Sequence, residues 1–216
     1  SYMSKDEKYT KYFEYFNFFV FSMLLLVLSG NFLVMFFGWE LVGLSSYLLI
    51  SFWYEKNSAA KAGNKAFILN RIGDFGFLIG LMMILNYFET FNFVNIFESV
   101  LIKQPSNLDL IILFLLLGAF GKSAQFPLFS WLPDAMEGPT PASALIHAAT
   151  MVTAGVFMLV RVSPMLQFSE LASLTIIGFG LLTALIAAFA AINQDDIKKV
   201  LAYSTISQLG LSLIHI

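Results

Sequence analysis

The sequence predicts an all-α polytopic membrane protein with about seven transmembrane helices, one of them discontinuous. Of its 216 residues, 58% are hydrophobic and 12% are charged, and the mean hydropathy is +0.79. An ordinary soluble domain has about 25% charged residues. The apolar residues fall into segments close to the roughly 20 residues that cross a bilayer. Four of the six prolines lie within residues 127–141, where they interrupt a helix.

The expected segments, in order, are residues 15–29, 31–53, 58–88, 108–127, 140–161, 172–192 and 195–216. Turn-forming residues at 29–31 predict that the first two helices form an antiparallel hairpin. Residues 57–58, Asn and Ser, can cap the third helix, and Pro141 suits the first turn of the fifth. Because Pro127 lies inside the fourth segment, we expect that segment to be discontinuous.

Basic residues at or near the ends of the apolar segments predict the orientation of the chain in the membrane. On the side of the N-terminus we expect Lys5, Lys8, Lys11, Lys56, Lys61, Lys65, Lys198 and Lys199. The other side has Lys103 and Arg161. By the positive-inside rule, the N-terminal side faces a cytoplasm or an organelle matrix. The sequence shows no obvious separate soluble domain, so we expect residues 1–216 to belong to a single transmembrane domain.

Composition argues against several kinds of site. A net charge of −2 gives no reason to expect a nucleic-acid partner. Without cysteine, the chain can hold neither an iron–sulfur cluster nor a thiolate metal site nor a disulfide. His147 has no second histidine at ligand spacing, so no metal site is predicted. Phosphate-loop, GxSxG and HExxH signatures are missing from the sequence, and we assign no catalytic residue.

Lys122 is the most informative residue, because it is a cation near the end of a mostly apolar run. Ionisable residues in membrane segments are costly and usually line a proton or ion path. Pro127 follows about one turn later and can open the helix beside the ammonium, while Ser123 and Gln125 make the surroundings polar. The alternative is a lysine at a helix end whose ammonium reaches the membrane surface.

Three further charges lie inside the second and third segments. Glu40 is near the middle of the second, where it either titrates as part of a relay or pairs with a cation on a neighbouring helix. Arg71 and Asp74 are three residues apart, on one face of the third helix. An intrahelical ion pair between them would explain both residues without transport.

His147 and Lys198 complete the set of candidates. The ordinary pKa of histidine suits a proton relay, although hydrogen bonds with Thr150 or Ser143 would also explain a buried histidine. Lys198 follows two acids, at residues 195–196, at helical spacing. A hydrated helix start explains this pattern fully, so a role for Lys198 needs support from elsewhere.

Four stretches together resemble a known family. They are GWELVGLSSYLLISFWY, NRIGDFGF, GKSAQFPLFSWLPDAMEGPTPASALIHAATMVTAG and DDIKKVLAYSTISQLG. They are similar to the antiporter-like membrane subunits of NADH:ubiquinone oxidoreductase, respiratory complex I, and in particular to its chain 5 family. The resemblance covers residues 1–210, and the third stretch is highly specific.

The resemblance implies two inverted five-helix repeats, each with a broken helix, and a row of charged residues along the middle of the membrane. Residues 15–161 would form the first repeat and residues 172–216 the start of the second. Asp74 would be the partner of the glutamate or of the lysine, and Pro127 would mark the helix break. The implied proton relay consists of Glu40, Asp74, Lys122, His147 and Lys198.

The function implied by the resemblance is proton translocation coupled to NADH oxidation and ubiquinone reduction. The complex would use NADH and ubiquinone, while this chain would bind no cofactor. Its partners would be other complex I membrane subunits and the lipid bilayer, in a mitochondrial inner membrane or, alternatively, a bacterial plasma membrane. Two other functions stay open: a subunit of a multisubunit sodium/proton antiporter, and a structural membrane subunit without a proton path.

The resemblance also implies a partial chain. A full subunit would continue through further helices and a long lateral helix. The last six residues, LSLIHI, depart from the continuation usual in the family, so no role is expected for His215.

Overall fold

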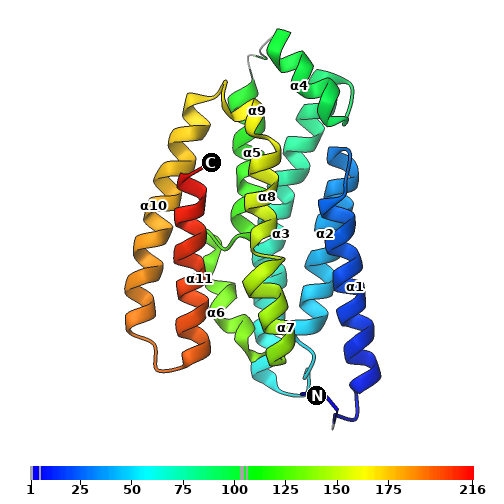
Figure 1. The fold of residues 1–216 in the computed structure, drawn as a ribbon, viewed down its shortest axis with the longest axis vertical. Helices are drawn as coiled ribbons and strands as arrows, with labels where there is room; N and C mark the ends of the chain where they lie inside the picture. Colours follow the sequence, from blue (N-terminus) through cyan, green and yellow to red (C-terminus); the bar gives the residue numbers. More distant parts are fainter. Residues whose placement is uncertain (1, 5, 103–104, 106) are drawn as a thin grey trace.

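The computed structural model describes residues 2–4, 6–102, 105 and 107–216. These residues form a bundle of helices that lie side by side along one long axis (Figure 1). The first half contains α1 (Tyr9–Val27), α2 (Phe32–Ile50), α3 (Asn57–Phe88), α4 (Phe93–Ile102) and α5 (Leu108–Lys122). No strand is formed in the described part of the chain, so the predicted all-α class is confirmed.

The second half begins with a series of short helices and ends with two long ones. They are η1 (Leu128–Ser130), α6 (Trp131–Asp134), η2 (Ala135–Glu137), α7 (Thr140–Ala144), the π-helical η3 (Leu145–Ala149), α8 (Thr153–Arg161), α9 (Ser163–Leu166), α10 (Glu170–Ile192) and α11 (Ile197–Ile214). In Figure 1, α10 and α11 form a pair at one edge of the bundle, with α1 and α2 at the opposite edge.

The hairpin of α1 and α2 was predicted correctly. Asn31 caps α2, because its side chain accepts a 2.8 Å hydrogen bond from the backbone N–H of Val34. The predicted cap of α3 was wrong: the N-cap is Lys56, without a capping side chain. Ser58 instead donates a 3.0 Å hydrogen bond to Glu137, because η2 brings that carboxylate within its reach.

The fourth segment is discontinuous, as predicted. Its first part, α5, ends at Lys122, five residues before Pro127, and η1 and α6 continue the chain. Ala124 has a φ of 50°, in the left-handed region that side chains other than glycine rarely adopt. The helix therefore ends at a backbone reversal between the lysine and the proline.

The fifth segment is also divided, which the sequence did not indicate. Pro141 lies in the first turn of α7 as expected, but α7 passes into the π-helical η3 before α8 begins. Thr150 follows η3, and its hydroxyl donates a 2.6 Å hydrogen bond to the Leu145 carbonyl. The break lies within the predicted segment and next to His147.

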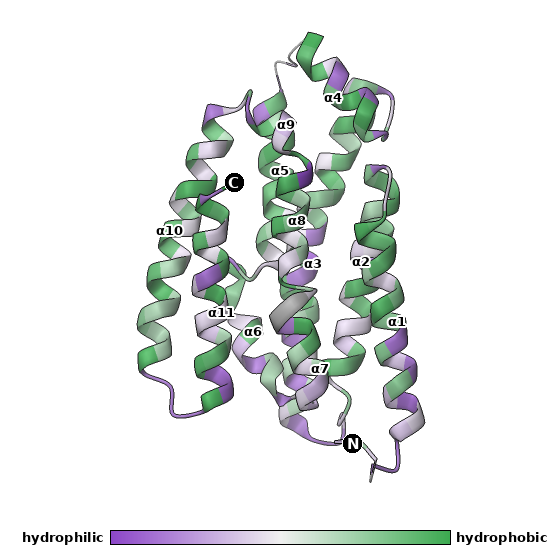
Figure 2. Ribbon diagram, viewed as in Figure 1, coloured by the Kyte–Doolittle hydropathy of each residue, from purple (hydrophilic) through white to green (hydrophobic). Residues whose placement is uncertain are grey.

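Three helices of the described part, α2, α3 and α10, are by themselves long and apolar enough to cross a membrane. α5 is shorter, with 15 residues, because it ends at Lys122. Figure 2 shows hydrophobic residues along most of each long helix and hydrophilic residues at the connections, such as that between α10 and α11. Lys5 and Lys103, used to predict orientation, lie outside the described residues.

Glycines allow α3 and α5 to approach closely beside the lysine. A Cβ on Gly73 would lie 3.0 Å from the Cα of Gly121, and a Cβ on Gly76 would lie 2.7 Å from the Leu117 side chain. Small residues at such crossings are typical of helix packing in membranes. This close crossing places Lys122, the last residue of α5, against the middle of α3.

Candidate functional site

Lys122 is the centre of the candidate site. Its side chain is fully buried, with 0% exposed, and its ammonium nitrogen lies 3.4 Å from Oδ2 of Asp74 on α3. The other oxygen of that carboxylate, Oδ1, accepts a 2.7 Å hydrogen bond from the indole N–H of Trp39 on α2. The alternative of a lysine that reaches the membrane surface is therefore wrong, because α2 and α3 enclose it.

Gly43 on α2 has no side chain and so leaves room for the Lys122 ammonium. A Cβ on Gly43 would lie only 2.7 Å from Lys122 Nζ. Nζ also lies 5.9 Å from the centre of the Trp39 ring, within the range of a cation–π interaction. Trp39, Gly43, Asp74 and Lys122 together are called the central cluster below.

The ammonium is sparsely satisfied for a buried charge. An ammonium has three N–H donors, and charge-assisted hydrogen bonds are usually about 2.7–2.9 Å long. Among the described residues, the Lys122 ammonium has a single hydrogen-bond partner, Asp74, at 3.4 Å. Its surroundings therefore hold the charge mainly through one carboxylate, in an interior where electrostatic interactions are weakly screened.

Polar side chains gather at the open end of α5. Ser123 donates a 2.7 Å hydrogen bond to the carbonyl of Val152, and Gln125 donates to the carbonyl of Ser123 at 2.9 Å. Trp131 donates a 3.1 Å hydrogen bond to the carbonyl of Gly121. The polar neighbourhood expected from Ser123 and Gln125 is present, and both residues are fully buried.

Glu40 forms an ion pair with Arg71 on α3. The two side chains are partly exposed in the described part, 23% for Glu40 and 38% for Arg71. The alternative of an intrahelical pair between Arg71 and Asp74 is not realised. Asp74 is instead held in the interior by Trp39 and Lys122, whereas Arg71 extends to Glu40 on α2.

His147 is buried in η3, with 4% exposed. The alternative of a histidine satisfied by Thr150 or Ser143 is not realised, because both hydroxyls donate to backbone carbonyls instead. Both ring nitrogens are without a hydrogen-bond partner among the described residues. The ring of Trp131 lies 6.2 Å from the histidine ring, so this tryptophan contacts both His147 and the end of α5.

Lys198 lies close to His147 in the fold. It lines a cavity of about 170 Å³ that His147 also lines, with Met136, Thr140, Ser143, Ala144, Leu201 and Thr205. The preceding acid Asp196 caps α11, accepting a 2.9 Å hydrogen bond from the Lys198 backbone N–H. The structure thus joins His147 to Lys198, and Lys122 to Asp74, as two separate groups.

Sequence reasoning missed Trp39, Gly43 and Trp131. Each acts across helices, and no local spacing reveals such a contact. One signal was available for the tryptophans, because a buried indole N–H usually needs an acceptor. Trp39 directly precedes Glu40 in the sequence. A hydrogen-bond acceptor for its indole N–H could therefore have been sought among residues at the same depth in the membrane.

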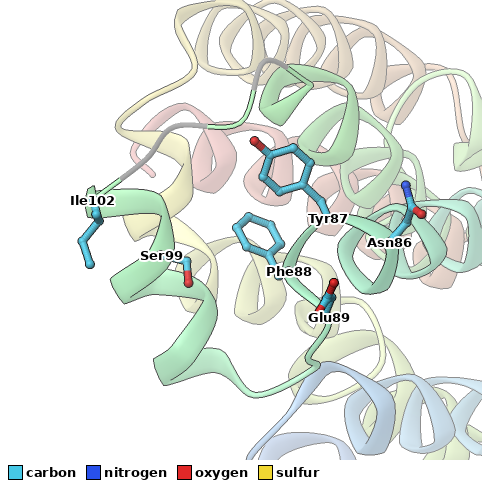
Figure 3. A pocket seen from close by; sticks show the side chains of 6 residues that line it. All are labelled: Asn86, Tyr87, Phe88, Glu89, Ser99 and Ile102. Carbon is cyan, nitrogen blue, oxygen red and sulfur yellow. The ribbon is translucent and has the colours of Figure 1, made fainter.

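Another cavity lies away from this cluster. It has a volume of about 650 Å³, opens between the end of α3 and α4, and is lined by Asn86, Tyr87, Phe88, Glu89, Ser99 and Ile102 (Figure 3). Glu89 is about 22 Å along α3 from Asp74, at 1.5 Å per residue. The described residues contain no group of three or more side chains suited to a metal ion.

An α-helical bundle with buried charges of both signs beside a discontinuous helix is typical of membrane proteins that transport ions or protons. Residues 29–216 match the family model described as NADH:quinone oxidoreductase/Mrp antiporter, TM. The chain belongs to this family, as its resemblance predicted.

Named relatives agree with that assignment. NADH-ubiquinone oxidoreductase chain 5 of Acanthamoeba castellanii is 54% identical, with 97% of this chain and 33% of the relative covered. NADH-quinone oxidoreductase subunit L of Rickettsia bellii is 51% identical, with 97% and 34% covered. The chain thus spans about a third of the length of these relatives.

A solved structure supports the fold. The Mrp complex from Dietzia sp. DQ12-45-1b matches with a TM-score of 0.89 and 35% sequence identity. The match covers 94% of this chain and 22% of the chain in that complex. The helical bundle is therefore shared with a chain of that complex.

Proposed function

We propose that this chain is part of a membrane subunit of respiratory complex I that takes part in proton translocation coupled to NADH oxidation and ubiquinone reduction. The observation that carries the proposal is the fully buried ammonium of Lys122 at a helix break, with Asp74 at 3.4 Å. A buried cation with one partner is a group whose proton affinity responds strongly to nearby charge.

The proposed relay consists of Glu40, Asp74, Lys122, His147 and Lys198. Moving one unit charge through 100 mV requires about 2.3 kcal/mol. Breaking a buried ion pair by removing a partner costs about 3–5 kcal/mol. The interaction of Lys122 with Asp74 is therefore of the same order in energy as moving one proton against such a potential.

The rest of the complex would supply the redox chemistry. We expect NADH and ubiquinone to be used by other parts of the complex, with no cofactor bound by this chain. Its partners would be further membrane subunits and the lipid bilayer. Relatives named chain 5 occur in eukaryotes such as Acanthamoeba castellanii and Rhizopus stolonifer, which supports a mitochondrial inner membrane over the alternative of a bacterial plasma membrane.

A second candidate is a subunit of a multisubunit sodium/proton antiporter. The structural match to the Mrp complex favours it, at 35% identity. The curated relatives named as oxidoreductase subunits are more similar, at 51–54% for the two described above. Sodium-dependent transport in proteoliposomes would support the antiporter over complex I.

The test substitutes Lys122 in the full-length subunit within its assembled complex. We expect Lys122→Met to abolish proton translocation, measured as protons moved per electron in proteoliposomes, while the complex still assembles. Lys65→Met is the control, because Lys65 pairs with Asp134 at 2.7 Å in a partly exposed position. Its translocation should equal that of the wild type.

Lys122→Met leaves the Asp74 carboxylate buried without its cation, which can prevent folding. The double variant Lys122→Met/Asp74→Asn removes both charges and keeps the test possible. A normal ratio of protons to electrons in either variant contradicts the proposal. Full translocation after Glu40→Gln combined with Lys122→Met would show that these charges serve only to hold the helices together.

A further inference from the structure

Trp39 is a fully buried side chain in contact with the relay but outside it. Its indole N–H donates a 2.7 Å hydrogen bond to Oδ1 of Asp74, while Oδ2 of the same carboxylate faces Lys122 at 3.4 Å. Among the described residues these are the two hydrogen-bond donors to the carboxylate. One donor comes from α2 and the other from α5, so Asp74 is held from two sides.

The indole is fixed in orientation by its neighbours. Its ring packs edge to face on Phe77, with 5.1 Å between ring centres and 84° between planes. Phe77 packs in the same manner on Phe36, at 5.3 Å and 86°, and a Cβ on Gly118 would lie 2.8 Å from the Phe77 Cβ. The indole N–H therefore points at Asp74 because of aromatic packing between α2 and α3, independently of Lys122.

The two donors differ in how firmly they hold the carboxylate. The Lys122 ammonium lies on a flexible four-carbon chain, at the longer distance, and its attraction depends on its proton. The hydrogen bond from the indole N–H is short, at 2.7 Å. Its donor is neutral and is fixed in place by the aromatic packing on Phe77. When the lysine releases its proton or moves away, the tryptophan is the donor that stays on Asp74.

We propose that Trp39 is a positioning residue that keeps the Asp74 carboxylate at the Lys122 site while Lys122 exchanges its proton. Without the indole donor, the carboxylate is free to turn away when the ammonium leaves, and it is misplaced when the ammonium returns. This inference rests on the proposed proton translocation only for its effect on transport. The contact itself is testable separately.

The test compares two identical substitutions in the full-length subunit within its complex. Trp39→Phe keeps a ring and removes the donor to Asp74. Trp53→Phe is the matched control, because the indole of Trp53 also donates to an aspartate, Asp6, at 3.0 Å, but near the end of the bundle. Three quantities are measured: assembly with quinone reduction, protons moved per electron, and the infrared band of the Asp74 carboxylate, assigned with Asp74→Asn.

We expect Trp39→Phe to assemble, to shift the Asp74 band, and to lower proton translocation about tenfold, the factor for losing one hydrogen bond to a charged group. Trp53→Phe should leave both the band and translocation unchanged. An unshifted band, or a shifted band with normal translocation, overturns the positioning role. Equal losses of assembly and translocation would show that Trp39 is only a packing residue.

A tryptophan analogue keeps the test decisive if Trp39→Phe fails to fold. Benzothienylalanine at position 39 has the shape of tryptophan with sulfur in place of the N–H. It should reproduce the band shift and the loss of translocation, and normal behaviour overturns the proposal. If Lys122→Met translocates normally while the Asp74 band still shifts in Trp39→Phe, the proposed function fails but the hydrogen-bond role of Trp39 does not.

Discussion

Gly43→Ala is the sharpest perturbation that the structure offers, because it moves the Lys122 ammonium without removing a charge. The new Cβ would lie 2.7 Å from Nζ and 3.9 Å from Asp74 Oδ2, and Nζ is 3.4 Å from Oδ2. An ordinary contact needs about 3.5 Å, so Nζ must retreat by about 0.8 Å. Nζ is the far end of a flexible side chain and can do so while the helices stay in place.

The three distances give the size of the effect. In the triangle that they form, the angle at Nζ is about 79°, so a retreat of about 0.8 Å directly away from the new methyl lengthens Nζ–Oδ2 from 3.4 Å to about 3.6 Å. This exceeds the usual limit of a hydrogen bond. We estimate a loss of about 1 kcal/mol for an already long bond, offset by about 1 kcal/mol from replacing glycine with alanine inside a helix.

The expected result is therefore a stable protein with impaired transport. The free energy of unfolding should change by no more than about 1 kcal/mol, whereas proton translocation should fall about five- to tenfold. Thermal unfolding of the purified complex and protons moved per electron measure the two quantities. Wild-type translocation by Gly43→Ala would refute the argument that the position of the Lys122 ammonium controls transport.

Two other glycines provide controls with the same substitution. A Cβ on Gly178, inside α10, meets nothing within 4 Å, so Gly178→Ala should stabilise slightly and leave translocation unchanged. A Cβ on Gly38 would lie 2.6 Å from the backbone nitrogen of Leu26, so Gly38→Ala should separate α1 from α2 and impair assembly. Only Gly43→Ala should impair transport while the complex assembles normally.

Three further outcomes follow from contacts outside the central cluster. Arg71→Gln removes a partly exposed ion pair with Glu40, so thermal stability should fall by no more than about 1 kcal/mol, while protons moved per electron should decrease. Gly155→Ala places a Cβ 2.5 Å from a backbone carbonyl of α5, so the complex should assemble poorly in native gels. The hydrogen bond from Trp53 lowers the pKa of Asp6. This contact should be intact above the ordinary aspartate pKa of about 3.9 and should be lost as the pH falls through the lowered pKa. Trp53 fluorescence should therefore change over that pH range in the wild type but not in Asp6→Asn.

The sequence was sufficient for the class of fold because each membrane helix is a local feature. Length, hydropathy and the prolines act over about 20 residues, and they located the break beside Lys122 correctly. α4 was missed because it has only 10 residues, about half the length that a helix needs to cross a bilayer. The π-helical turn at His147 was missed because no proline or glycine marks it.

Contacts between helices could not be predicted in the same way. Asp74 is separated by 35 residues from Trp39 and by 48 from Lys122, so no sequence period joins them. The resemblance named Asp74 as the partner of either the glutamate or the lysine, and the structure shows the lysine. The relay through these residues, His147 and Lys198 stays a prediction.

Arg71 and Asp74 do not pair, but their closeness on α3 explains why the partly exposed Glu40–Arg71 pair should influence the interior. Their spacing is suitable for a pair, and about 4.5 Å of helix rise separates them. Asp74 nevertheless pairs with Lys122, and Glu40 holds Arg71 away. If Glu40 loses its charge, Arg71 loses its partner and becomes a competing cation close to Asp74. At an effective dielectric constant of about 20, unit charges about 6 Å apart interact by about 3 kcal/mol before screening by solvent, which is comparable to the energy of moving one charge through 100 mV. The Glu40–Arg71 pair can therefore alter the hold of Asp74 on Lys122 without any contact between Glu40 and the lysine.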